Sequence, residues 1–166
     1  MDFDLTEELT MVRDSAREYA EKWVAPGAAA RDLSAEFPWE QFKKAAEYGF
    51  TGICTPEAYG GAGLGNQALC LVLVEVNRAC AATGVTLSVH NSLCTAPLLK
   101  FGTDEQKQRF LPQLASGDVL GAYSLSEAGS GSDAAALGRR GAPHSQLPPG
   151  RSGRAGSDGE GRESRK

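Results

Sequence analysis

Apolar residues near the start of the chain recur with the period of an α-helix. They stand three or four residues apart, at Leu5, Leu9, Val12, Ala16, Tyr19 and Trp23. This spacing places them on one face of an amphipathic helix, which the sequence APG at Ala25–Gly27 is expected to end. Asp4 is the expected N-cap residue, with Glu7 at the capping-box position three residues later. The pattern therefore predicts a first amphipathic helix.

Two more helices are predicted before residue 84. One begins near Pro38 and ends at Gly49, because proline favours the first turn of a helix and glycine the position after its end. The other follows a glycine-rich loop and covers residues 66–84, with Asn66 as its expected cap. Its sequence is apolar nearly all round, so we expect it to be buried between neighbouring helices.

Helical patterns continue over residues 84–117. An alternation that, taken alone, fits a short strand occurs there, at Val85, Leu87 and Val89. The context favours one or two helices instead. Thr103 and Gln106 have capping-box spacing and open a last helix. Residues 119–125 then turn to β-forming types, which predicts a strand.

These elements predict a mainly α fold class, a helical bundle followed by the first strand of a truncated β domain. We divide the chain into a helical domain over 1–117, the start of a β domain over 118–137 and a tail over 138–166. Leu147 is the only large apolar residue of the tail, so we expect the tail to be disordered. Its Gly- and Arg-rich composition also matches an out-of-frame translation of GC-rich DNA, and both interpretations stay open.

Composition narrows the class of protein. With 166 residues, 41% hydrophobic and 23% charged, the chain suits one ordinary soluble domain. A net charge of −4 gives no general attraction to nucleic acid or to anionic lipid, so we expect neither as a partner. The acidic start, and an apolar run over 68–74 that Glu75 ends, predict a cytoplasmic protein. The four cysteines form no C-x-x-C pair, which favours reduced, packed thiols over a metal site.

The sequence GSGSDA over residues 129–134 has the G-x-G-x-x-A spacing of a dinucleotide-binding turn. Such a turn needs a helix after it and an acidic residue about 20 positions further on. No helical pattern follows, and Asp158 lies in the tail, so the sequence does not favour a dinucleotide-binding turn. Small residues here offer backbone amides and hydroxyls to an anion or a flavin, at Ser126, Gly129, Ser130, Gly131 and Ser132. A plain Ser/Gly/Asp turn fits them equally well.

Four segments resemble the acyl-CoA dehydrogenase family. GAYSLSEAGSGSDA over 121–134 is similar to the family signature, with Ala128 where the family usually has proline. The sequences TPEAYGGAGL, ATGVTLSVHNSL and LLKFGTDEQKQRFLPQLASGD are similar to other family segments and stand in the same order. The resemblance covers Leu5 to about Leu137 and is nearest to the short-chain, butyryl-CoA type.

The resemblance implies an FAD-dependent enzyme of fatty acid β-oxidation that dehydrogenates an acyl-CoA substrate and is reoxidised by an electron-transferring flavoprotein. It places Tyr123, Leu125 and Ser126 along the flavin. Gly131 and Ser132 approach the cofactor, and Ser132 also reaches the substrate. His90 and Asn91 lie in the segment that resembles the family's cavity helix, but His90 is more simply interpreted as a hydrogen-bonded core residue.

No catalytic residue is assigned within this chain. Members of the family place the base in a C-terminal helical domain, so we expect Glu127 to be structural. The full-length family forms a homotetramer, largely through that domain. We therefore expect the chain to be truncated and inactive alone, with weak flavin binding at most. The alternative is a non-catalytic helical protein-binding module.

Overall fold

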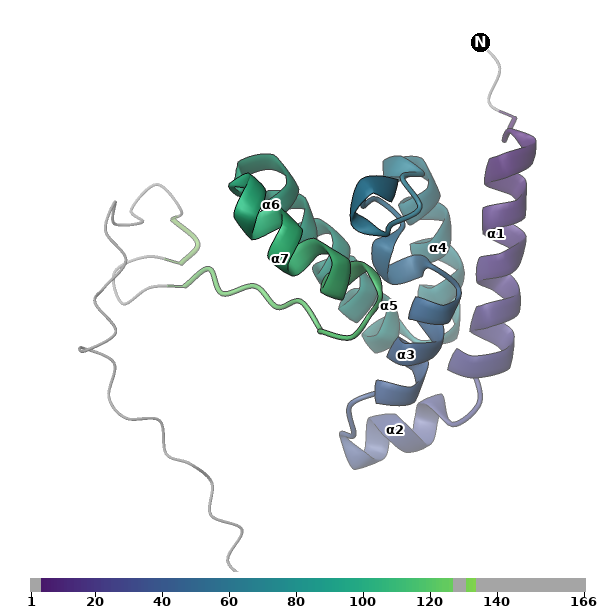
Figure 1. Ribbon diagram of the computed structural model, residues 1–166. Coiled ribbons are helices and arrows are strands. Elements are labelled where there is room, and N and C mark those ends of the chain that lie inside the picture. Colours follow the sequence, from purple (N-terminus) through teal and green to yellow (C-terminus); the bar gives the residue numbers. More distant parts are fainter. Residues whose placement is uncertain (1–3, 127–130, 134–166) are drawn as a thin grey trace, which may run out of the picture. The chain divides into compact units, whose positions relative to one another are not determined.

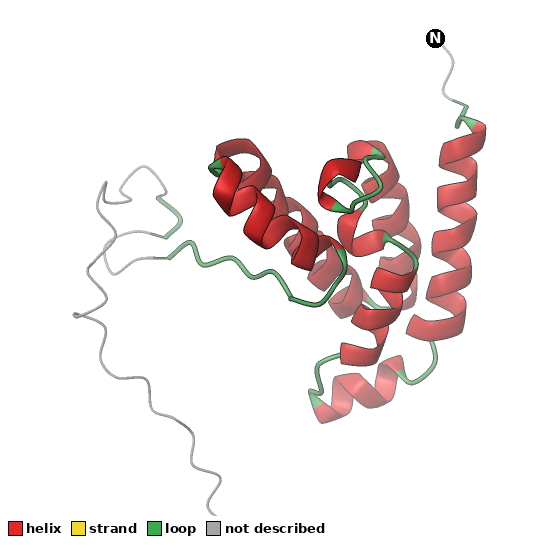
Figure 2. Ribbon diagram, in the orientation of Figure 1, coloured by secondary structure: helices red, strands yellow, loops and turns green. Residues whose placement is uncertain are grey.

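The computed structural model describes residues 4–126 and 131–133, which contain helices and no strand (Figures 1 and 2). Their order is α1 (Glu7–Tyr19), η1 (Ala20–Val24), α2 (Ala28–Ser34), α3 (Trp39–Glu47), η2 (Phe50–Gly52), η3 (Glu57–Tyr59), α4 (Gly65–Ala79), α5 (Ala81–Ser88), η4 (Val89–Thr95), α6 (Ala96–Phe101) and α7 (Asp104–Ala115). The predicted mainly α class is confirmed. The chain divides into two units, Met1–Ser124 and Leu125–Lys166, and each is considered by itself.

The ends of the helices follow their capping residues. Thr103 and Gln106 form the predicted capping box at the start of α7, with N to O distances of 2.9 and 3.2 Å. The prediction of Asp4 as the first cap is wrong, because α1 begins at Glu7 and the hydroxyl of Thr6 accepts the N–H of Leu9. A cap side chain reaches only the N–H groups two or three residues after it, which puts Asp4 too early.

Two further details of the helices differ from the predictions. Asn66 is not the cap of α4, since the helix begins at Gly65 and the Asn66 side chain instead accepts a hydrogen bond from the thiol of Cys54 at 3.7 Å. Helix α2 was not predicted, and none of its residues is buried. A short helix without a buried face leaves no apolar periodicity in the sequence to detect.

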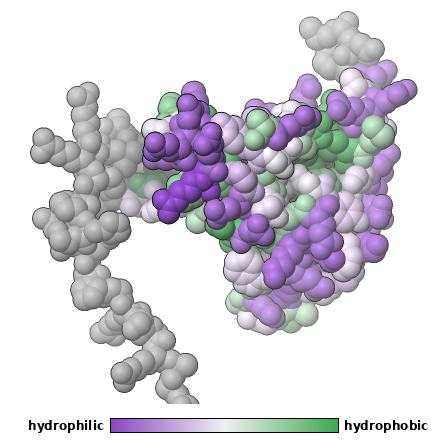
Figure 3. All heavy atoms as spheres, in the orientation of Figure 1, coloured by the Kyte–Doolittle hydropathy of each residue, from purple (hydrophilic) through white to green (hydrophobic). Residues whose placement is uncertain are grey.

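Helix α4 lies between α1 and α5 and contacts both (Figure 1). Its buried side chains form one stripe, made of Ala68, Leu69, Val72, Glu75 and Val76. The expected place between neighbouring helices is thus confirmed, but the burial is limited to this stripe, since Val74 is 57% exposed and Cys70 is also exposed. On the face drawn in Figure 3, hydrophilic side chains cover most of the surface and apolar ones form small patches between them.

Aromatic side chains close the core beside this stripe. Tyr19 and Phe50 meet edge to face with ring centroids 5.5 Å apart, and the Tyr19 hydroxyl donates to the carbonyl of Gln41 at 2.8 Å. Burial raises the pKa of Tyr19, so this hydroxyl stays protonated and remains a donor. The largest fully buried apolar side chains include Phe42, Ile53, Leu87 and Leu111. The contiguous core therefore joins α1, α3, α4, α5 and η2, and Leu111 is buried on α7.

The chain after α7 runs through residues 119–126 without joining a sheet in the part that the structure describes. The predicted strand at 119–125 is not formed there, because a strand exists only where a second one completes its ladder of hydrogen bonds. The remaining predictions for 127–130 and for 134–166, including the disordered tail, lie outside the described residues.

Within the described ranges, no helix is both long enough and apolar enough to cross a lipid bilayer.

One buried carboxylate links the two longest helices. Glu75 on α4 accepts hydrogen bonds from Arg17 on α1 at 2.9 and 3.3 Å, and from Arg78 at 3.2 Å, while its side chain is 7% exposed. Hydrogen bonding from Arg17 is the main cause that lowers the pKa of Glu75. The stabilisation is present above the ordinary carboxyl range and is lost as the pH falls through the lowered pKa.

Replacing this carboxylate should destabilise the bundle. Glu75→Ala leaves Arg17 and Arg78 without their shared acceptor, and we expect a loss of about 1–3 kcal/mol in the free energy of unfolding. Glu47→Ala is the matched control, because it removes an exposed pair with Lys44 and should change stability by less than about 1 kcal/mol. Urea denaturation followed by circular dichroism measures both free energies of unfolding. Equal losses would contradict the conclusion that Glu75 stabilises the bundle as a buried, shared acceptor.

Candidate functional site

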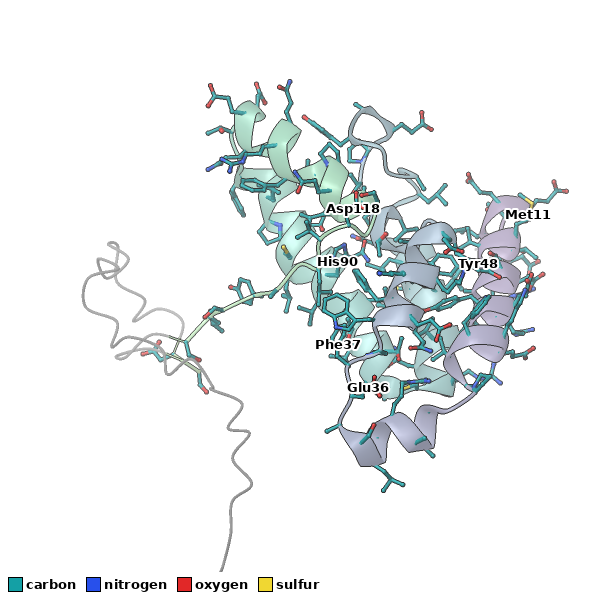
Figure 4. The ribbon with its side chains drawn as sticks, turned by 60° about the horizontal axis from the view of Figure 1, so that its bottom comes forward. Met11, Glu36, Phe37, Tyr48, His90 and Asp118 are labelled. Atoms are coloured by element: carbon teal, nitrogen blue, oxygen red, sulfur yellow. The ribbon has the colours of Figure 1, made fainter. Side chains whose placement is uncertain are left out.

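The segment that carries the predicted flavin residues leaves the bundle past His90. This residue lies in η4 and its side chain is fully buried. The Nε2 atom lies 3.0 Å from the carbonyl oxygen of Leu114 on α7, and the N–H of Gly121 donates to Nδ1 at 2.9 Å. Figure 4 shows His90 inside the bundle, close to the chain that follows α7. One ring thus joins a helix to the departing segment.

These two partners determine the protonation state of His90. A carbonyl only accepts and a backbone N–H only donates, so Nε2 carries the proton and Nδ1 does not. Burial is the main cause that lowers the pKa of His90, and hydrogen bonds to the carbonyls of Leu114 and Thr51 oppose it. The imidazole is therefore neutral at physiological pH. The interpretation of His90 as a hydrogen-bonded core residue is confirmed.

Neighbouring side chains contact both the backbone and the ring of His90. The Thr95 hydroxyl donates to the His90 carbonyl at 2.8 Å, and the ring of Phe42 lies edge-on, 5.3 Å away between centroids. A Cβ atom at Gly121 would lie 2.7 Å from both the Cβ and the Sγ atoms of Cys94, and 3.2 Å from Nδ1 of His90. Only a glycine lets the backbone approach the ring this closely.

A small apolar cavity lies beside the same segment. Its volume is about 340 Å³, and Cys94, Leu98, Phe110, Leu114, Val119 and Leu120 are among its lining residues. Burial raises the pKa of the Cys94 thiol, which keeps it protonated. The cavity therefore offers apolar surface and no charge from these side chains.

A second apolar surface lies on the neighbouring helical stretch. Val85 is 57% exposed, Leu93 is 42% exposed and Val89 between them is half-buried. The three residues stand four apart along α5 and η4, in the segment whose sequence resembles the family's cavity helix. The prediction of helix rather than strand for this segment is confirmed.

The five predicted cofactor residues fall into the two units. Tyr123, in the first, is 49% exposed. In the second, Leu125 is 39% exposed, Ser126 and Ser132 are exposed, and Gly131 is half-buried. The structure brings together Ser126 and Gly131, since a Cβ atom at Gly131 would lie 3.8 Å from Oγ of Ser126. Glu127 lies outside the described residues.

The hydrogen bond that the N–H of Gly121 donates to His90 is a feature that the sequence did not reveal. These residues stand 31 positions apart, and no spacing rule links a helical histidine to a glycine in a later segment. Among the described residues, no group of three or more His, Cys, Asp or Glu side chains is placed to hold a metal. The four cysteines are free thiols, and Cys70 is exposed rather than packed as expected.

Comparison with known proteins identifies this class of helical domain. Residues 6–118 match the family described as acyl-CoA dehydrogenase, N-terminal domain. The chain therefore belongs to the acyl-CoA dehydrogenase family, as the sequence resemblance suggested.

Three relatives illustrate how far the similarity extends. An acyl-CoA dehydrogenase of Bacillus subtilis is 47% identical over 133 residues, which cover 80% of this chain and 35% of that protein. Butyryl-CoA dehydrogenase from Megasphaera elsdenii superposes with a TM-score of 0.75 at 34% identity, over 82% of this chain and 36% of the other. The Bacillus anthracis acyl-CoA dehydrogenase complexed with FAD superposes with a TM-score of 0.73 at 34% identity, over 79% of this chain and 22% of the other. The chain thus spans about a third of the length of the curated relative.

A side chain at Gly121 should disturb the anchoring of the segment. In Gly121→Ala the new methyl group would press against Cys94 and His90, and we expect a loss of about 1–3 kcal/mol in stability. Gly131→Ala is the matched control, because its Cβ atom would make only ordinary contact, and it should be nearly neutral. Thermal unfolding of both variants checks this. An unchanged stability of Gly121→Ala would contradict the close approach of the Gly121 backbone to Cys94 and His90.

Proposed function

We propose that this chain forms the flavin- and acyl-facing N-terminal part of an FAD-dependent acyl-CoA dehydrogenase that acts on a short-chain acyl-CoA thioester. Family membership supports the reaction class, and the name of the Megasphaera relative supports the short chain. The observation that carries the proposal is the exposed segment after Gly121. It presents an aromatic side chain, hydroxyl groups and a glycine within a few residues of one another in the sequence.

The residues of this segment suit a flavin. Tyr123 and Leu125 offer apolar surface that a planar ring can cover. Ser126 and Ser132 offer hydroxyl donors, and Gly131 leaves its backbone open to close approach. When bound, FAD supplies the acceptor for the hydrogen that leaves the β carbon as hydride. These five residues are our candidates for holding it.

The acyl chain requires a different surface. We assign it to the exposed face of α5 and η4 that carries Val85, Val89 and Leu93, because apolar side chains there gain free energy when an alkyl chain covers them. Ser132 is the candidate hydroxyl on the polar side of the substrate. Donors fixed around the thioester carbonyl stabilise the negative charge that develops when the α proton is removed.

A general base must remove that α proton. We assign no described residue to this role and place the base in a C-terminal region of the enzyme, as the family resemblance implies. An electron-transferring flavoprotein is the proposed acceptor of the electrons, and β-oxidation of fatty acids the proposed pathway. On this proposal the 166 residues alone do not turn over substrate.

Transfer of the segment into a complete relative tests the proposal. A chimaera in which the matched residues replace those of the Bacillus subtilis enzyme should bind FAD and oxidise butyryl-CoA with an artificial electron acceptor. Ser126→Ala and Ser132→Ala should each reduce kcat/KM roughly tenfold or more, because each removes a donor from the site. Ser34→Ala, whose hydroxyl bonds only to the Arg31 carbonyl of its own helix α2, is the control and should change nothing.

Flavin content, read from absorbance, separates a misfolded chimaera from an inactive one. A flavin-loaded chimaera whose activity ignores both serine substitutions would contradict the assignment of these residues.

The isolated chain gives a second test. We expect the purified 166-residue polypeptide to show no dehydrogenation of butyryl-CoA above background, because the proposal assigns the base to no residue of this chain. Turnover that Ser126→Ala or Ser132→Ala abolishes would overturn that expectation. A stable chain that binds a protein partner but neither flavin nor acyl-CoA would favour the alternative of a non-catalytic binding module.

A further inference from the structure

We propose that His90 is a positioning residue that ties the start of the flavin-facing segment to helix α7 and releases it when the ring is protonated. The functional meaning of this tie rests on the proposed function, since the segment is the one assigned to the flavin. The tie itself stands on the geometry around the ring, which is independent of any ligand.

The tie acts where the chain leaves the bundle. The N–H of Val119 still donates to the carbonyl of Gln113 on α7, at 3.2 Å. Two residues later, the N–H of Gly121 donates to Nδ1 of His90, and the backbone of Ala122 then contacts the Cys94 thiol. Tyr123 follows directly and is half exposed. The bond to His90 is therefore one of the last that direct the segment before the first predicted flavin residue.

Protonation of Nδ1 would replace this hydrogen bond with two donors that face each other. A proton on Nδ1 makes that atom a donor, and it would then face the N–H of Gly121, which is also a donor. The groups around His90 are the ring of Phe42, the backbone of Thr51 and the carbonyl of Leu114, with the Thr95 hydroxyl on the His90 carbonyl and the Cys94 thiol beside Gly121. None of them carries a negative charge to compensate a buried imidazolium, and the raised pKa of Cys94 keeps that thiol neutral.

The direction of the pH effect follows from burial of the neutral ring. Because the folded pKa is lowered, the tie is complete above the ordinary histidine value of about 6.5 and is lost as the pH falls below it toward the folded pKa. Weakening the tie exposes the backbone of Gly121 to water while the rest of the core keeps its packing. The segment is thus held at neutral pH and loosened in acid.

Amide hydrogen exchange in the full 166-residue chain tests this tie without any flavin or substrate. Exchange at Gly121, corrected for the intrinsic pH dependence, is compared with Val72 and Val76 in the core of α4. In the unmodified chain we expect protection of Gly121 to fall roughly tenfold as the pH drops from neutral to about 5, while the α4 amides stay protected.

Two variants separate hydrogen bonding from packing. His90→Gln keeps a donor for Leu114 and an acceptor for Gly121 but does not titrate, so Gly121 should stay protected across the pH range. His90→Phe fills the space without either bond, so Gly121 should exchange roughly tenfold faster at every pH. If either variant fails to fold, the pH series on the unmodified chain decides.

The proposal is overturned if protection of Gly121 does not depend on pH in the unmodified chain, or if His90→Phe leaves it unchanged. Because the readout involves no ligand, failure here leaves the proposed dehydrogenase function intact. Conversely, an inactive chimaera would contradict the proposed function. If protection of the Gly121 amide still depended on pH, the proposal for His90 would stand.

Discussion

The neutral ring of His90 is the contact on which the candidate site depends. One of its nitrogens donates to the last turns of α7 and the other accepts from Gly121, where the chain leaves the bundle. Both bonds require a single proton on the ring, and burial supplies the condition that keeps it so. The start of the segment, at Gly121, is therefore held from inside the helical core.

The neighbouring helices position η4, which carries His90, through their contacts with it. Helix α4 packs against α1 and α5, and the buried Glu75 fixes the first of these contacts through Arg17. Helix α5 continues directly into η4, which carries His90 inward and Leu93 outward to the surface assigned to the acyl chain. One helical stretch thus contributes both the ring that anchors Gly121 and the apolar face that carries Val85, Val89 and Leu93.

Much of the helical fold was predictable, because each long helix buries one stripe and leaves a period in the sequence. The first helix was found for that reason, and the start of α7 was found from the capping-box spacing of Thr103 and Gln106. Helix α2 was missed because it has no buried face. The strand predicted at 119–125 is absent from the described residues, which contain no second strand to complete its hydrogen-bond ladder. The signature residues were recognised by resemblance. The hydrogen bond between Gly121 and His90 joins positions 31 residues apart and is visible only in the folded structure.

Nitrogen NMR of the His90 imidazole tests the central claim most directly. In the labelled 166-residue chain near neutral pH, the account predicts a proton on Nε2, none on Nδ1, and a scalar coupling between Nδ1 and the amide nitrogen of Gly121 across their hydrogen bond. This coupling should disappear in acid. Ring resonances that titrate like an exposed histidine near pH 6.5, with no coupling to Gly121, would contradict the account.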